Sequence, residues 1–387
     1  MQELSWLLLP VAAASGWWAA TRSGRDRKVP SNETNPVYFR GLNHLLNEEP
    51  DKAIDVFVEM LEVDSDTVET HLALGNLFRR RGEVERAIRI HQNLIARPAL
   101  SGEHRGQALL ELGQDYFRAG LYDRAENLFN ELRQDRQLVP QALRNLLLIY
   151  QQERDWEACL KTATELEGKA DDRLGLEKSH YYCELAKLAQ RDGRDDRANE
   201  LLLNALEEDP ACVRASHLRA KMALARGDTE QGLQYLQAAV EQNADYLPEV
   251  VDEIVEAFRS LEQNEAITDF LRKMALNHPN QGAELHLVDQ YREQQGEEAA
   301  IDYLSGYIAR TPSLLGLIRL LELQCSKPEG RNDTLLQQVR MQLQRLIRDR
   351  AAYQCGKCGF EAKTLHWQCP SCHSWGTLKR RPLRESN

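Results

Sequence analysis

The small and apolar side chains of this chain recur at a regular interval, separated by polar stretches. In the second half, four small residues stand 34 positions apart: Ala198, Gly232, Ala266 and Ala300. Ala53 and Ala87 show the same interval, and Ala125 follows Ala87 by 38 positions because of a four-residue insertion. Twelve positions before most of these residues stands a second small set: Gly41, Gly75, Gly113, Ala186 and Ala220. This pattern predicts pairs of α-helices that approach each other closely at the small residues.

A period of 34 residues is the length of one tetratricopeptide helix–turn–helix unit. Aromatic residues occupy recurrent positions between the small ones: Phe57, Tyr116, Phe129, Tyr150, Phe270 and Tyr291. An unrelated helical bundle would have to match the interval by chance over seven or eight units. The sequence therefore predicts an all-α tetratricopeptide-repeat solenoid over residues 37–330, with about eight to nine repeats.

Composition and charge fit a surface-rich helical array better than a large β core. Of the 387 residues, 28% are charged and only 7% are aromatic, and the net charge is −11. Basic residues gather near both ends, so the middle of the chain is strongly acidic. An acidic array repels nucleic acid, so no nucleic-acid partner is expected.

The first 21 residues predict a transmembrane anchor. Residues 4–20 contain no charged side chain and would span roughly 26 Å as a helix, near the short limit for crossing a bilayer. Trp17 and Trp18 suit the membrane interface, and residues 22–36 form a basic segment and linker. A secretory signal peptide would carry its positive charge before the apolar run, and a buried soluble helix would lack the basic flank. The positive-inside rule predicts a single pass with a periplasmic amino terminus and cytoplasmic repeats.

Two CxxC pairs give the strongest chemical signal in the chain: Cys355, Cys358, Cys369 and Cys372. Two such pairs form a tetrahedral sulfur cage for one zinc or iron ion. We predict a small metal ribbon over residues 353–378, followed by a basic tail over 379–387. Disulfides would require an oxidising compartment. Because four thiolates complete the shell, the neighbouring His366 and His373 are not expected to be ligands.

The remaining candidates suggest no catalysis. The other cysteines are scattered along predicted helices and are assigned no chemistry: Cys159, Cys183, Cys212 and Cys325. Several histidines occupy helical positions without an evident carboxylate partner: His71, His91, His180 and His217. The sequence carries no P-loop, dinucleotide fingerprint, G-x-S-x-G or H-E-x-x-H motif. The protein is therefore expected not to be an enzyme.

Residues 331–352 predict a connecting helix that caps the last repeat, because solenoids need an end cap. Its apolar face is formed by Leu335, Leu336, Val339, Leu343, Leu346 and Ile347.

The combination of anchor, repeats and ribbon resembles the lipopolysaccharide assembly protein B (LapB) family. The similarity covers essentially the whole chain and is particularly close in residues 74–79, 81–84, 86–92 and 120–126. The ribbon reads C-x-x-C-G-F…H-W-x-C-P-S-C-x-x-W. The family's terminal module is described as rubredoxin-like, and its four cysteines map onto Cys355, Cys358, Cys369 and Cys372. Rubredoxin itself has a longer interval between its pairs, so the choice between iron and zinc stays open.

The resemblance implies regulation of lipopolysaccharide synthesis at the bacterial inner membrane. Family members act as adaptors for the membrane AAA+ protease FtsH and promote degradation of the LpxC deacetylase. A membrane lipopolysaccharide-sensing protein restrains them. Two other functions stay open: a scaffold that gathers synthesis and export proteins without a proteolytic role, and a nucleic-acid-binding ribbon. An electron carrier is a more remote third reading. The sequence leaves open whether the chain forms homo-oligomers.

Repeat register predicts a partner-binding surface on first helices. Its residues are Leu72, Asn76, Arg79, Leu110, Gln114 and Phe117.

Overall fold

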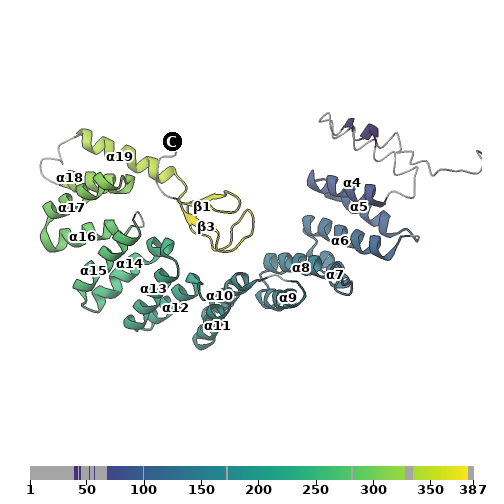
Figure 1. The fold of residues 1–387 in the computed structure, drawn as a ribbon, viewed down its shortest axis with the longest axis horizontal. Coiled ribbons are helices and arrows are strands. Elements are labelled where there is room, and N and C mark those ends of the chain that lie inside the picture. Colours follow the sequence, from purple (N-terminus) through teal and green to yellow (C-terminus); the bar gives the residue numbers. More distant parts are fainter. Residues whose placement is uncertain are drawn as a thin grey trace, which may run out of the picture. The chain divides into compact units, whose positions relative to one another are not determined.

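The computed structural model describes residues 68–98, 100–170, 173–279, 282–326 and 334–381, together with 39–41, 43, 44, 52 and 56. The predicted anchor (1–21) and basic linker (22–36) lie outside the described residues. The chain divides into two compact units, the first ending at Leu138 and the second beginning at Val139 (Figure 1). Among the described helices, none combines the length and the apolar composition that a bilayer crossing requires.

The described part of the first unit is a run of antiparallel helix pairs. Its helices are α4 (Val68–Arg80), α5 (Val84–Ile95), α6 (Gly102–Arg118) and α7 (Tyr122–Leu132). Each helix packs on the next, and α4 also contacts α6. First helices of successive repeats therefore lie side by side and share one face, as in a tetratricopeptide solenoid.

The second unit continues the same pairing and ends in a small sheet. Its helices are α8 (Val139–Glu153), α9 (Trp156–Lys169), α10 (Gly175–Arg191), α11 (Asp195–Glu208), α12 (Val213–Ala225), α13 (Thr229–Gln242), η2 (Ala244–Tyr246), α14 (Leu247–Ser260), α15 (Asn264–Asn277), α16 (Ala283–Gln295), α17 (Glu297–Arg310), α18 (Leu314–Ser326) and α19 (Thr334–Asp349). Here α10 contacts α12 and α14 contacts α16, so first helices lie side by side within this unit as well. The mostly helical repeat array is confirmed.

The small residues have the packing role that their spacing predicts. Ala87, Ala125, Ala198 and Ala300 are fully buried. A Cβ added at Gly75 would lie 2.3 Å from Nε2 of His91, and one at Gly113 would lie 2.5 Å from the Phe129 ring. No side chain fits at these distances, so the two helices of a repeat meet where the first carries glycine.

The turn between the two helices of a repeat uses a left-handed residue. Glycine provides it in most repeats, as at Gly193 (φ 71°) and Gly227 (φ 83°). Arg154 (φ 60°) and Glu262 (φ 59°) adopt the same conformation without being glycine. Because the two helices of each repeat must be joined by the same tight turn, Arg154 and Glu262 adopt a backbone conformation that is strained for residues other than glycine.

The helix predicted over residues 331–352 is present as α19, but it uses only part of its apolar face. It packs on α18, and Gln344 Nε2 donates to Glu322 Oε1 at 3.1 Å. Several of the predicted capping residues are exposed: Leu335 at 68%, Leu346 at 57% and Val339 at 41%. These three side chains therefore lie largely outside the contact with α18, and the capping role of this helix stays a prediction.

Candidate metal centre

The cysteine ribbon is built on a three-stranded antiparallel sheet. Its strands are β1 (Tyr353–Cys355), β2 (Glu361–Ala362) and β3 (Leu378–Arg380), in the order β2-β1-β3. Tyr353 pairs with Ala362 on one side and with Arg380 on the other. The ribbon has a small core of its own, formed by Tyr353, Cys355, Ala362, Cys369 and Leu378. A core of this size is too small to hold the fold alone, so the ribbon depends on additional links.

The two CxxC pairs form turns of the same shape. The backbone N–H of Gly359 donates to the carbonyl of Cys355 at 2.9 Å, and that of His373 donates to the carbonyl of Cys369 at 2.9 Å. Gly359 has φ 77° and His373 has φ 55°. Both turns therefore end in a left-handed residue directly after the second cysteine, which turns both sulfurs of each pair inward.

The four sulfur atoms have the spacing of a tetrahedral metal site. All four lie within 4.8 Å of one another. Cys355 Sγ is 3.7 Å from Cys372 Sγ, and Cys358 Sγ is 3.7 Å from Cys369 Sγ. A metal–sulfur bond of about 2.3 Å gives tetrahedral edges of about 3.8 Å. The arrangement therefore supports a four-cysteine site for one ion, and the donor set suits both zinc and iron.

Hydrogen bonds prepare some of these thiols for ionisation. Thr377 Oγ1 lies 3.2 Å from Cys355 Sγ, and this contact, with backbone N–H groups of the turn, lowers the pKa of Cys355 to about 6. A hydrogen bond from Ser374 lowers the pKa of Cys372. Burial raises the pKa of Cys369 to about 11. A metal cation bound by the four sulfurs would lower the pKa of Cys369 and so ionise this thiol as well.

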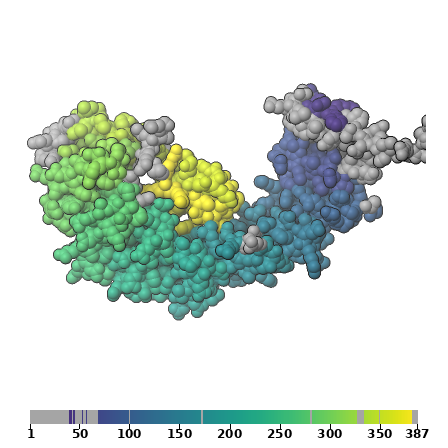
Figure 2. Space-filling model, viewed as in Figure 1, coloured from purple at the N-terminus to yellow at the C-terminus, as the bar shows by residue number. Residues whose placement is uncertain are grey.

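The ribbon is seated on the first helices of the second unit through Trp375. This side chain is 4% exposed and stacks on His180 of α10, with ring centroids 5.0 Å apart and an interplanar angle of 19°. Tyr181 and Trp156 meet the same indole edge-on, each at 6.0 Å. Figure 2 shows the yellow ribbon lying directly against the helices of this unit. Aromatic packing of this kind resists separation of the two parts.

Arg214 of α12 forms a second anchor. Its side chain is only 3% exposed and makes an ion pair with Glu184 of α10 at 2.6 Å. The guanidinium carbon lies 5.5 Å from the ring centroid of Trp367 and 5.9 Å from that of Trp375. A desolvated guanidinium over two indoles is a favourable cation–π arrangement.

Polar contacts complete the seat. Gln151 Oε1 of α8 accepts from Gln368 Nε2 at 2.7 Å and from Trp375 Nε1 at 3.3 Å. The hydroxyl of Tyr353 donates to Glu249 of α14. The contacts thus come from several successive repeats, and they fix the orientation of the ribbon on the array.

Comparisons with known proteins place these features in one family. Residues 353–380 match the family model of the rubredoxin metal binding domain. Tetratricopeptide-repeat models match residues 70–105, 110–161 and 183–247. Lipopolysaccharide assembly protein B of Escherichia coli strain K12 is 38% identical over 386 residues, which cover 99% of each chain. The protein of the same name from Haemophilus influenzae is 34% identical over 397 residues, with 100% of each chain covered.

The chain belongs to the lipopolysaccharide assembly protein B family. Solved structures with a similar repeat fold are more distant. The C-terminal part of a TPR repeat-containing protein from Cytophaga hutchinsonii is 12% identical, with a TM-score of 0.39, and covers 73% of this chain and 99% of that one. MamA from Desulfovibrio magneticus RS-1 is 16% identical, with a TM-score of 0.32, and covers 46% and 97% respectively.

The partner surface predicted for this family member lies in the first unit. Leu72, Asn76, Gln114 and Phe117 are half-buried on α4 and α6. Leu110 is only 4% exposed and belongs to the core, so its predicted place on the surface is wrong. It lies on the side of α6 that packs inward.

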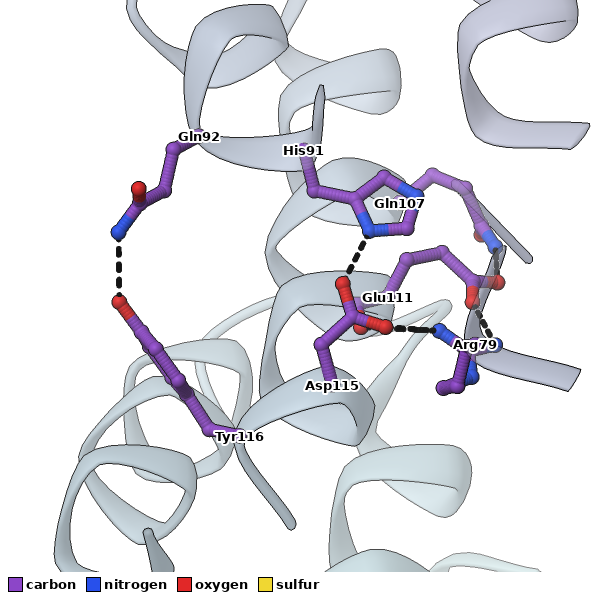
Figure 3. A network of polar contacts seen from close by, with 7 residues as sticks. All are labelled: Arg79, His91, Gln92, Gln107, Glu111, Asp115 and Tyr116. Atoms are coloured by element: carbon purple, nitrogen blue, oxygen red, sulfur yellow. Dashed lines mark hydrogen bonds and ion pairs between the residues drawn. The ribbon is translucent and has the colours of Figure 1, made fainter. Parts of the chain in front are cut away.

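Arg79, the remaining predicted surface residue, is held in a polar network (Figure 3). It pairs with Glu111 at 2.6 Å and with Asp115 at 2.7 Å. Asp115 also meets Nδ1 of His91 at 2.5 Å, and both side chains are fully buried. Burial opposes the positive charge of Arg79, but the two carboxylates outweigh it and raise the pKa of Arg79. The network fixes the guanidinium between α4 and α6.

The expectation that the helical histidines lack carboxylate partners is wrong for two of them. His91 meets Asp115 in the network above. His217 Nε2 lies 2.9 Å from Glu253 Oε2, and its Nδ1 lies 3.2 Å from the hydroxyl of Tyr246. In both cases the partner comes from the first helix of the following repeat, which proximity in sequence does not reveal.

The residues of the array on which the ribbon is seated were not predicted from the sequence. These residues are Gln151, Trp156, His180, Tyr181, Arg214, Tyr246 and Glu249. Two of these residues could have indicated a contact. His180 and Arg214 lie on the buried side of first helices, where the repeat pattern predicts apolar residues. Trp375 of the ribbon is 4% exposed, so it has little surface left for stacking on a nucleic-acid base.

Proposed function

We propose that this protein is a non-enzymatic adaptor of the bacterial inner membrane that limits lipopolysaccharide synthesis. It would promote degradation of the LpxC deacetylase by a membrane AAA+ protease of the FtsH type. The observation that carries this proposal is the full-length relationship to relatives named lipopolysaccharide assembly protein B. A repeat array with a metal ribbon seated on it supports a binding role.

The metal ribbon serves as a structural part of this adaptor. Cys355, Cys358, Cys369 and Cys372 would hold one zinc or iron ion. Four thiolates leave no open position for water or substrate, so the ion staples the ribbon instead of supplying catalysis. The stapled ribbon presents Trp367 and Trp375 to helices of the second unit, and these contacts join the ribbon to that unit.

Membrane attachment would raise the effective concentration of adaptor and protease. We propose that residues 1–21 cross the inner membrane, with the amino terminus periplasmic and the repeats and ribbon cytoplasmic. Confinement to one plane makes a weak contact between array and protease sufficient without further binding energy. A membrane protein that senses lipopolysaccharide would restrain the adaptor in the same plane.

The client surface is proposed on α4 and α6. Asn76, Gln114 and Phe117 are partly exposed there, and Leu72 flanks them. The network around Arg79 holds its guanidinium in a fixed position, which reduces the entropy lost when a partner binds. Preorganised polar groups beside an aromatic side chain suit a protein partner.

The half-life of the deacetylase tests the proposal. After synthesis is blocked, the deacetylase should decay several-fold more slowly in cells that lack this protein. Deletion of residues 1–20 should give the same slow decay at native expression. A scaffold without a proteolytic role would leave the half-life unchanged, and that result would refute the adaptor proposal.

A further inference from the structure

Two cysteines of the array form a buried pair on neighbouring first helices. Cys183 lies in the middle of α10, and Cys212 is the residue that caps the amino terminus of α12. Their Sγ atoms are 3.9 Å apart, and the residues are 0% and 4% exposed. Both belong to one apolar cluster, so they are held face to face by the packing of α10 on α12.

The surroundings of Cys212 favour its thiolate. The Cys183 sulfur lies 3.9 Å from that of Cys212 and is the main cause that favours the thiolate, and the nearby Ser179 hydroxyl and the backbone N–H of Ala215 act in the same direction. These contacts outweigh burial and lower the pKa of Cys212 to about 7. Cys159, which is also buried in the array, shows the opposite behaviour, since burial raises its pKa to about 12. A thiolate at a helix amino terminus is a typical nucleophile.

Cys212 also has a route to small reagents. It lines a cavity of about 140 Å³ between the array and the ribbon, together with His180, Arg214 and Trp367. Hydrogen peroxide, the smallest hydroperoxide, is little larger than water and fits a space of this size. Cys183, in contrast, does not line this cavity and is fully buried.

We propose that Cys183 and Cys212 form a reversible thiol–disulfide pair that is oxidised by a hydroperoxide. The Cys212 thiolate attacks one peroxide oxygen, the O–O bond breaks, and the leaving alkoxide or hydroxide takes up a proton. Cys212 is then a sulfenic acid. The sulfur of Cys183 attacks it, the S–S bond forms and the S–O bond breaks, and the hydroxyl leaves as water with the Cys183 proton. The two thiols supply the two electrons that reduce the peroxide.

The pair lies where its oxidation would affect the ribbon. An S–S bond of about 2.05 Å requires the two sulfurs to approach from 3.9 Å. That movement draws α10 against the first turn of α12. His180 and Arg214, which hold Trp375 and Trp367, lie on these same segments. Oxidation should therefore alter the seat of the ribbon and the fluorescence of its tryptophans.

Peptide mapping of the full-length, zinc-loaded protein tests this proposal. After exposure to hydrogen peroxide, remaining thiols are alkylated under denaturing conditions and the protein is digested with trypsin. We expect a disulfide between the peptides 179–187 and 198–214, with a mass two hydrogens below the sum of the reduced peptides, and its loss on treatment with dithiothreitol. Cys159→Ala is the matched control and should leave the linked peptide unchanged.

A second variant separates the two steps. In Cys183→Ala the linked peptide should disappear, while dimedone should trap a sulfenic acid on Cys212. If this variant does not fold, the mapping of the natural sequence still decides the question. Two results would overturn the proposal. In the first, Cys183 and Cys212 are both still alkylated at a peroxide concentration that already oxidises the ribbon cysteines. In the second, disulfides form only within the ribbon.

Discussion

The guanidinium of Arg214 lies 5.5 Å from the ring centroid of Trp367, and this contact joins an array helix to the metal ribbon. The two residues are far apart in the sequence and belong to parts that the sequence presents as separate modules. Arg214 is also paired with Glu184 and is almost fully buried. The ribbon is therefore a fixed part of the second unit, and its position depends on charged and aromatic side chains of the array.

Replacement of Arg214 should loosen the ribbon. Arg214→Gln removes the cation–π contacts and the 2.6 Å ion pair with Glu184, and should lower the free energy of unfolding by about 3 kcal/mol. Hydrogen exchange in residues 365–378 should become markedly faster. The matched control is Arg197→Gln. Arg197 pairs with Glu200 on the exposed surface, so this change should lower the free energy of unfolding by less than about 0.5 kcal/mol. Equal exchange rates in the two variants would contradict this role of Arg214.

Stability of the second unit should fall on mild acidification because of His180. Burial, aided by the charge of Arg214, lowers the pKa of His180 to about 3. The unfolded chain binds a proton near pH 6.5 and the folded chain does not, so stability is lost as the pH falls from 6.5 towards 3. Between pH 7 and pH 5 the loss should be about 2 kcal/mol.

Denaturant titration at both pH values measures this loss, with His180→Phe as the comparison. Phenylalanine can keep the stacking on Trp375 but does not titrate. We expect the difference between pH 7 and pH 5 to shrink by about 2 kcal/mol in this variant. An unchanged difference would show that His180 does not control it.

Replacement of the left-handed residue in each of the two CxxC turns should change zinc affinity, and the two changes should have opposite signs. His373→Gly relieves a strained backbone and should tighten zinc binding about fivefold, equivalent to about 1 kcal/mol. Gly359→Ala should weaken binding by a similar factor, since a methyl group there meets no neighbour and only the backbone is strained. Competition with a chromophoric chelator measures both. Gly356→Ala is the control, because a Cβ there would have only an ordinary contact 3.8 Å from Thr377 O. Weaker binding in His373→Gly would instead point to a ligand role for His373.

Removal of the metal should unfold the ribbon but not the array. A strong chelator, or the change Cys369→Ser, should leave the far-ultraviolet helical signal nearly intact, because the ribbon strands are short. Trp367 and Trp375 should become exposed to solvent, with a red-shifted emission, and trypsin should cut at Lys357 and Lys363. If the chelator abolished the helical signal as well, the array would depend on the ion, contrary to this description.

The sequence was sufficient for features that depend on local spacing. The 34-residue period predicts the helix pairs, and the CxxC pairs predict the sulfur cage, because in each case the residues involved lie close together in the chain. The seat of the ribbon is different, since Gln151 and Trp375 meet across more than two hundred residues. No periodicity in the sequence encodes that distance.

Histidine positions show the same limit. His91 occupies the place over Gly75 that Phe129 occupies over Gly113, so the repeat suggests a packing residue. Its contact with Asp115 depends on how one repeat stacks on the next. The left-handed turns at Arg154 and Glu262 are also hidden, because residue type alone favours another backbone there.

The decay of the LpxC deacetylase in cells that carry Trp375→Ala, at native expression, tests the central claim most directly. We claim that the adaptor needs its ribbon to be seated on the helices of the second unit. Loss of the Trp375 contacts should therefore slow the decay to the rate seen without the protein. Tyr303→Ala changes an aromatic residue that touches neither the ribbon nor the proposed client surface, so it serves as the control and should keep the fast decay. The claim would be contradicted if the Trp375→Ala protein were stably expressed with its ribbon unseated and the deacetylase still decayed fast.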